Sequence, residues 1–186
     1  MAKIVRKESE KMSRKKILGI NGSASINSTN RNILKNIYKY LSIECDYQII
    51  DNLNTYPHFQ TELTDSNVPE DIVNLRNEIL NSDGIIISSP EYIFSIPSRL
   101  KNIIEWCVST TVFSDKPICI ITASASGEKG HEELKLIMKT VQAKISEELC
   151  LLISGSKGKF NQNGDIIDES LEEKLKKLMI QFEQSI

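Results

Sequence analysis

Five short apolar segments stand out from the chain as predicted strands. In most of them isoleucine, leucine or valine fill neighbouring positions without alternation, which is typical of strands buried on both faces. The segments are residues 16–21, 47–51, 84–88, 117–122 and 149–153. The segment at 47–51 is the weakest of them.

Amphipathic helices are predicted in the intervals, because apolar residues recur there at spacings of three and four. The clearest stripe consists of Leu134, Ile137, Met138, Val141 and Ile145. Strands that alternate with helices imply parallel pairing and right-handed crossovers. The fold class is therefore α/β with a five-stranded parallel sheet, although periodicity leaves the order of the strands open.

The length of 186 residues favours a single domain, which we place at residues 15–186. Residues 1–14 are dense in charge and have little to bury, so we expect a mobile extension. The alternative for this segment is an arm that binds nucleic acid or membrane. No leader peptide is expected, because the basic start is not followed by an apolar core.

Charge and composition narrow the class of protein. The net charge of -2 and the lack of an obviously basic face argue against a nucleic-acid partner. No apolar run approaches the about 20 residues that a membrane-spanning helix needs. The cysteines are scattered, so we expect neither a metal site nor a redox dithiol, and reduced thiols fit a cytoplasmic location.

The polar segment 21–31 follows the first predicted strand and leads into a helix that begins near Ser28 or Thr29. Gly22 permits a tight reversal there, and hydroxyl groups come from Ser23, Ser25 and Ser28. A helix N-terminus offers free N–H groups and partial positive charge, which suit a phosphate. The alternative is that Ser28 or Asn27 only caps the helix. Neither a Walker loop nor a dinucleotide turn is present.

A second informative segment follows the strand at 84–88. It consists of the turn Pro90-Glu91-Tyr92, then Pro97, then Leu100-Lys101-Asn102, and then Glu105 and Trp106. This order resembles the flavin loop of NADPH-dependent FMN reductases. The segments 22–30, 123–131 and 160–168 are also similar to that family.

The resemblance implies a flavodoxin-like three-layer sandwich with strand order 2-1-3-4-5, FMN as cofactor, and NADPH or NADH as co-substrate. Because the cofactor would carry the chemistry, no catalytic side chain and no metal are expected. It further implies a homodimer or homotetramer. The implied FMN-binding residues are Ser23, Ser25, Ser28, Thr29 and Asn30 at the phosphate, Pro90, Glu91, Tyr92 and Ile93 at the ring, and Ser124 and Gly127 in a third loop.

The chain departs from the family pattern in three places. Ser25 stands where an arginine is usual, Ile93-Phe94 replaces Asn-Gly, and His131 replaces a glycine. Loss of the arginine would weaken charge complementarity toward the phosphate. We expect Phe94 to stack on the ring, gate the pocket or contact another subunit, and His131 to be an exposed polar residue at a helix start.

The predicted function is an FMN-dependent NAD(P)H oxidoreductase. It would pass hydride from NADPH to bound FMN and then to a small acceptor such as a quinone, a flavin, an azo compound or a metal oxyanion. The alternative is a flavodoxin-like electron carrier or flavin-binding module without NAD(P)H oxidase activity, which the serine-rich first loop favours.

Overall fold

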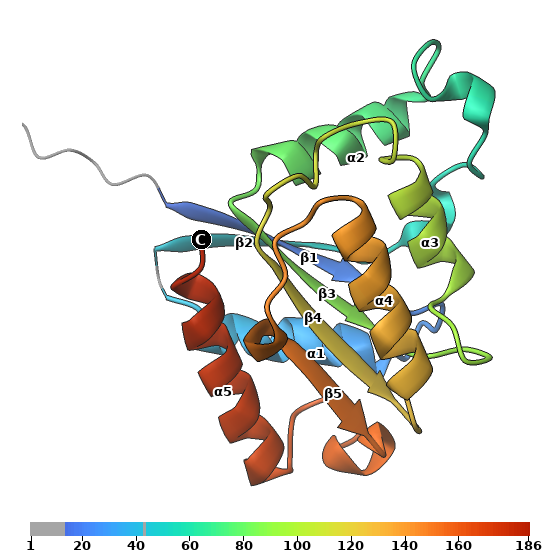
Figure 1. Ribbon diagram of the computed structural model, residues 1–186. Helices are drawn as coiled ribbons and strands as arrows, with labels where there is room; N and C mark the ends of the chain where they lie inside the picture. Colours follow the sequence, from blue (N-terminus) through green and yellow to red (C-terminus); the bar gives the residue numbers. More distant parts are fainter. Residues whose placement is uncertain (1–13, 43) are drawn as a thin grey trace, which may run out of the picture.

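The computed structural model of the protein describes residues 14–42 and 44–186, so nearly all of the predicted extension lies outside the described residues. Five parallel strands form one sheet in the order β2-β1-β3-β4-β5, which confirms the predicted fold (Figure 1). The strands are β1 (Lys15–Asn21), β2 (Cys45–Ile50), β3 (Gly84–Ser89), β4 (Ile118–Ser124) and β5 (Cys150–Ser154).

Helices cover both faces of the sheet, so the molecule has three layers (Figure 1). The helices α1 (Thr29–Ile37) and α5 (Glu169–Glu183) lie on one face. The helices α2 (Glu70–Asn81), α3 (Ser98–Glu105) and α4 (Glu128–Thr140) lie on the other. Among the described residues no helix combines the length and the apolar character that spanning a bilayer requires.

The central strand β3 shows why the predicted strands lack alternation. Ile85 and Ile87 face the core beneath α2, α3 and α4, whereas Ile86 faces the core beneath α1 and α5. All three side chains are fully buried. A strand between two helical layers has no solvent face, so apolar side chains fill both sides of its central part, and the two serines at its carboxyl end are buried as well.

The clearest predicted helix ends earlier than its apolar stripe. α4 stops at Thr140, and Gln142 adopts a positive φ of 63° that breaks the helical path. Ala143 N–H then donates to the Met138 carbonyl at 3.0 Å. Ile145 therefore packs on the same core from the segment that leads to β5, which is why periodicity alone included it in the helix.

Because the strands are parallel, their carboxyl ends share one edge of the sheet, where the arrowheads lie in Figure 1. Loops that follow β1, β3, β4 and β5 leave the sheet at this edge. In an open α/β sheet, ligands bind outside the carboxyl ends of the strands.

Candidate functional site

A cavity of about 510 Å³ lies at this edge and is enclosed by the four loops. It contains most of the predicted FMN-binding residues, namely Ser23, Ser25, Ser28, Thr29, Asn30, Pro90, Tyr92 and Ser124. Asn27, Ala123, Ala125, Gly155, Ser156 and Lys157 also line it. The predicted residues Glu91, Ile93 and Gly127 do not.

The loop after β1 is shaped by the close approach of its backbone to β3. Gly22 N–H donates to the Ser88 carbonyl at 2.8 Å. A Cβ at Gly22 would lie 2.7 Å from Ser89 Oγ and 2.9 Å from Leu100, so only glycine fits. The chain then reaches α1, where Ser28 Oγ accepts from Arg31 N–H at 3.3 Å and caps the helix.

Asn30, in the first turn of α1, fastens the helix to the sheet. Its amide group donates to the Ala123 carbonyl of β4 at 3.0 Å, and its Oδ1 accepts from Ser88 Oγ of β3 at 3.0 Å. The side chain is buried. The first N–H groups of α1, which have no partner within the helix, are thereby held at the cavity.

Arg31 is engaged away from the cavity. Its Nε forms an ion pair with Asp51, which follows β2, and Asp51 also accepts from Asn21 Nδ2 at 2.9 Å. Arg31 therefore does not take the place of the arginine that is missing at Ser25.

Hydroxyl groups join the two principal loops of the cavity. Ser23 Oγ lies 3.3 Å from the Tyr92 hydroxyl and accepts from Ser25 N–H at 3.2 Å. Ser25 Oγ donates to the Asn27 carbonyl at 3.3 Å. The serine-rich loop is thus ordered by its own hydrogen bonds.

The loop after β3 forms a tight two-residue turn. Tyr92 and Ser95 exchange backbone hydrogen bonds of 2.9 and 3.1 Å around Ile93 and Phe94. Both central residues have positive φ, 51° and 59°. Their side chains are 96% and 76% exposed, so neither Ile93 nor Phe94 packs into the cavity.

The Glu91 side chain forms a contact that the sequence pattern did not predict, and the predicted ring contact of this residue stays a prediction. Its Oε2 accepts from Gly130 N–H at 2.8 Å, in the first turn of α4. The Glu91 carbonyl meanwhile accepts from Ser124 Oγ at 3.4 Å. Glu91 therefore connects the loop after β3 to the end of β4 and to α4.

The loop after β4 turns at Gly127, which precedes α4 with φ 94° and ψ −5°. A Cβ there would lie 2.9 Å from Leu152 Cδ1, so Gly127 serves the turn and the packing against β5. The expectation that His131 is exposed is wrong. His131 is buried, with its Nδ1 2.8 Å from Thr122 Oγ1, because it shares the inward stripe of α4 with Leu134 and Met138.

The loop after β5 was not predicted to take part in the site. Gly155, Ser156 and Lys157 nevertheless line the cavity. The usable signal was topological: β5 is parallel to β4, so its carboxyl end must reach the same edge. Composition gave no hint, because Lys157 stands in an ordinary polar stretch.

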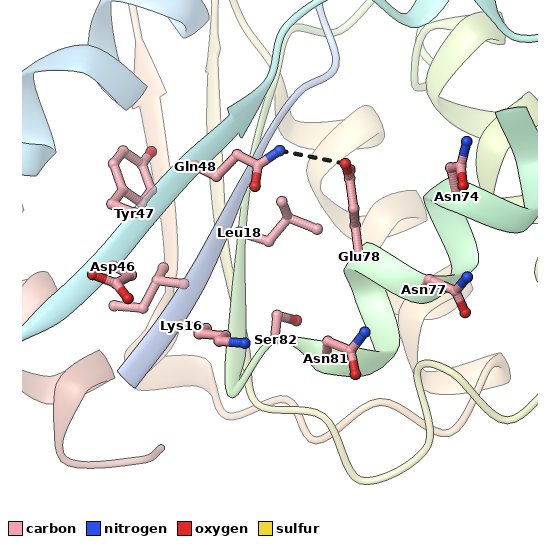
Figure 2. A pocket seen from close by; sticks show the side chains of 11 residues that line it. Lys16, Leu18, Asp46, Tyr47, Gln48, Asn74, Asn77, Glu78, Asn81 and Ser82 are labelled. Carbon is pink, nitrogen blue, oxygen red and sulfur yellow. Dashed lines mark hydrogen bonds between the residues drawn. The ribbon is translucent and has the colours of Figure 1, made fainter. Parts of the chain in front are cut away.

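A second cavity, of about 650 Å³, lies at the opposite end of the sheet, between β2 and α2 (Figure 2). Its lining is largely polar, with Asn74, Asn77 and Asn81 on α2, and Gln48 donates to Glu78 at 3.4 Å. It begins at the amino ends of β1 and β2, where Lys16 and Asp46 lie, and shares no lining residue with the first cavity. The first cavity, which holds most of the predicted binding residues, is therefore the candidate functional site.

Two other kinds of site, a metal centre and a nucleophilic cysteine, find little support in the described residues. No group of three or more His, Cys, Asp or Glu residues is placed to hold a metal ion in residues 14–42 and 44–186. Burial raises the pKa of the Cys107 thiol to about 12, and burial likewise raises that of Cys119 well above its usual value. Both thiols are therefore protonated core residues rather than nucleophiles.

Comparison with known proteins settles the family. The sequence profile described as NADPH-dependent FMN reductase matches residues 15–158. The chain belongs to this family. Its members are flavin-dependent oxidoreductases, and the chain is accordingly an FMN reductase-type enzyme that uses FMN and NAD(P)H.

Two relatives illustrate the range of this FMN reductase family. The NADH:(hydroxy)cinnamate reductase subunit CrdA of Vibrio ruber is 31% identical over 82% of this chain and 77% of its own length. The NADH-dependent flavin reductase subunit 2 of Lactobacillus johnsonii is 30% identical over 82% of this chain and 85% of its own.

A solved structure shares the fold. The flavoenzyme NAD(P)H:(acceptor) oxidoreductase FerB from Paracoccus denitrificans superposes with a TM-score of 0.80 at 22% identity, over 90% of this chain and 94% of FerB. At that identity the likeness supports the three-layer architecture alone.

Proposed function

We propose that the cavity at the carboxyl ends of the strands is the FMN site of this oxidoreductase. The phosphate would lie against Ser23, Ser25, Ser28, Thr29 and Asn30 in the first loop and first turn of α1. The ring would lie between the Pro90–Tyr92 turn and the loop that contains Ser124. The observation that carries this proposal is the convergence of these segments on one cavity.

The residues present fit FMN in size and in donor chemistry. The volume of about 510 Å³ lies within the range of cofactor pockets. The N-terminus of α1 and several hydroxyl-bearing residues line one end of the cavity, as phosphate recognition at a helix N-terminus requires. Pro90, Tyr92, Ala123 and Ala125 supply apolar surface for a planar ring.

FMN, when bound, accepts hydride from NADPH or NADH and passes electrons to the second substrate. The protein contributes binding and orientation. Asn30 and Glu91 hold the loops in place through buried and half-buried hydrogen bonds that belong to the protein alone. A site that is already ordered spends less binding free energy on ordering its loops.

The acceptor is proposed to be a small molecule. Relatives are named for flavins and for hydroxycinnamates, which are planar, conjugated compounds. Tyr92 lines the cavity and is 40% exposed, so the cavity carries aromatic surface that a second substrate can reach. Stacking on such surface suits quinones, flavins and azo compounds better than metal oxyanions.

We also propose that the protein is cytoplasmic and acts as a homodimer or homotetramer. The family resemblance supports this assembly, while two relatives named as subunits raise the alternative of a complex with a different chain. Light scattering coupled to gel filtration measures the mass of the purified protein, and a monomeric mass contradicts the proposal.

The decisive experiment is anaerobic addition of NADPH, and separately NADH, to protein loaded with FMN and freed of excess cofactor. Rapid loss of the visible flavin absorbance is the expected result. If loaded protein oxidises neither nucleotide faster than free FMN does, the proposed function is wrong. The same protein is then titrated with quinone, flavin and hydroxycinnamate acceptors to rank them by turnover.

A further inference from the structure

The FMN site as described lacks a cation in the first loop. The family places an arginine where this chain has Ser25, and a phosphate monoester carries about −1.5 to −2 charge at neutral pH. The helix N-terminus offers the equivalent of roughly half an elementary charge. Most of the phosphate charge therefore needs another partner.

One charged side chain is found among the described residues that line the cavity, and it is Lys157. The remaining lining residues are Ser, Thr, Asn, Pro, Tyr, Ala and Gly. No acidic residue of the described chain lines the cavity to neutralise this lysine. Lys157 is exposed at the cavity that the hydroxyls and the N-terminus of α1 also line, and an ammonium group added to such N–H and O–H groups makes a set of donors for an anion.

The neighbouring cations are already engaged. Arg31 is paired with Asp51, and Lys159 Nζ lies 2.6 Å from Asp168 Oδ2. Asp168 also caps α5 by accepting from Leu171 N–H. Lys157, by contrast, has no ion pair within residues 14–42 and 44–186, so its charge is available to a ligand.

The loop that carries Lys157 is fastened to the rest of the site. Gly155 turns the chain with φ 63°, and its N–H donates to the Ala125 carbonyl at 3.1 Å. Ser154 Oγ donates to the Ser126 carbonyl at 2.9 Å. Asn30 binds the carbonyl of Ala123 near the end of β4, two residues before Ala125, so the segment that carries Lys157 and the first turn of α1 are held to the same stretch of chain.

We propose that Lys157 binds the FMN phosphate and supplies the charge that an arginine supplies elsewhere in the family. The charged contact to the phosphate would thus come from the loop after β5, while the hydroxyls and N–H groups of the first loop and α1 keep their contacts with it. This inference rests on the proposed FMN site. It predicts that Lys157 distinguishes FMN from riboflavin, which has the same ring without the phosphate.

The test is a titration of the apoprotein with FMN and with riboflavin, followed by quenching of flavin fluorescence. Lys157→Gln removes the charge and keeps much of the side-chain length, and Lys157→Arg keeps the charge. Lys139→Gln, at the exposed end of α4 away from the cavity, is the matched control. Circular dichroism verifies that each variant is folded.

In Lys157→Gln we expect FMN affinity to fall about 5- to 20-fold, as for loss of a partly exposed charged hydrogen bond. Riboflavin affinity should change less than about twofold, and the dependence of FMN affinity on salt should become shallower. Lys157→Arg and the control should bind FMN like wild type. Introducing Ser25→Arg into Lys157→Gln should restore FMN affinity.

Two results overturn the inference. In the first, Lys157→Gln binds FMN as wild type does; in the second, FMN and riboflavin weaken together. Wild-type protein that binds neither flavin instead refutes the proposed FMN site, and the assignment of Lys157 falls with it. The riboflavin titration of wild type separates these failures.

Discussion

Replacing Ile93 with asparagine and Phe94 with glycine should make the apoprotein more stable. The two residues occupy the centre of the turn closed by Tyr92 and Ser95, and both have positive φ. Two-residue turns of this kind favour Asn-Gly, because these residues adopt positive φ with little strain. A branched side chain such as isoleucine is the least suited to it.

The magnitude follows from the exposure and the backbone angles. Left-handed geometry destabilises the folded state by roughly 1–2 kcal/mol for an ordinary residue. A glycine removes this strain, but the greater conformational entropy that it gives to the unfolded chain offsets about 0.5–1 kcal/mol of the gain. At 96% and 76% exposure, the two side chains lose little packing when they are replaced. We expect the double variant to gain about 1.5–2 kcal/mol, or about 3–8 °C in Tm for a chain of this size.

Urea denaturation of the flavin-free protein measures this gain without interference from cofactor binding. The midpoint should rise while the slope m stays unchanged, because the surface exposed on unfolding is nearly the same. Ile167→Asn is the control, since Ile167 is also exposed and lies in a loop but has no positive φ. A double variant no more stable than wild type would show that the turn is not strained.

Three further predictions concern the loop after β4 and its contacts. Gly127→Ala should lower the free energy of unfolding by about 1–3 kcal/mol in denaturant melts, because alanine is strained at φ 94° and its Cβ meets β5. Glu91→Ala should cost about 1 kcal/mol in the same melts by removing the acceptor of Gly130 N–H, whereas Glu91→Gln keeps an oxygen there. Burial lowers the pKa of His131 below 6.5, so protein stability should fall as pH drops from 6.5 toward that lower pKa, and His131→Asn should flatten this part of a pH series of urea melts.

Each of these has a matched comparison. Gly158→Ala has open space and no positive φ, so it should be neutral, and equal losses at both glycines would contradict the turn argument. Equal melts for Glu91→Ala and wild type would mean that the bond to α4 carries no stability. For His131, the sign follows because the unfolded chain binds a proton at a pH where the folded chain does not. If the free energy of unfolding of wild type minus that of His131→Asn rises as the pH drops below 6.5, the prediction is wrong.

The sequence was informative where short-range pattern and topology agree. The isoleucine-rich strands were found to within a few residues, because burial on both faces leaves an unambiguous apolar run. The strand order came from family resemblance, since hydrophobic periodicity carries no information on which strands pair. Ser23, Ser28 and Tyr92 reach one cavity because each follows a strand that ends at the same edge.

Contacts between residues distant in the sequence could not be predicted. The Glu91 carboxylate accepts from Gly130 N–H, 39 positions away, and the residues around either position give no sign of this contact. Lys157 could be recognised as a cavity residue only once the parallel pairing of β5 with β4 was known, because that pairing brings the loop after β5 to the cavity. His131 could have been placed correctly, because it lies three and seven positions before Leu134 and Met138 on the inward stripe of α4.

The hydroxyl contact between Ser23 and Tyr92 makes the two ends of the cavity interdependent. One residue belongs to the loop after β1 and the other to the loop after β3, and 3.3 Å separates their oxygens. A ligand that shifts Ser23 would lengthen its contact with Tyr92, and a ligand that displaces Tyr92 would remove that partner of Ser23. The binding free energies of a phosphate and of a flavin ring, measured separately, therefore need not add up to that of the whole cofactor. Inorganic phosphate bound in the loop after β1 would change the affinity of the loop after β3 for a ring.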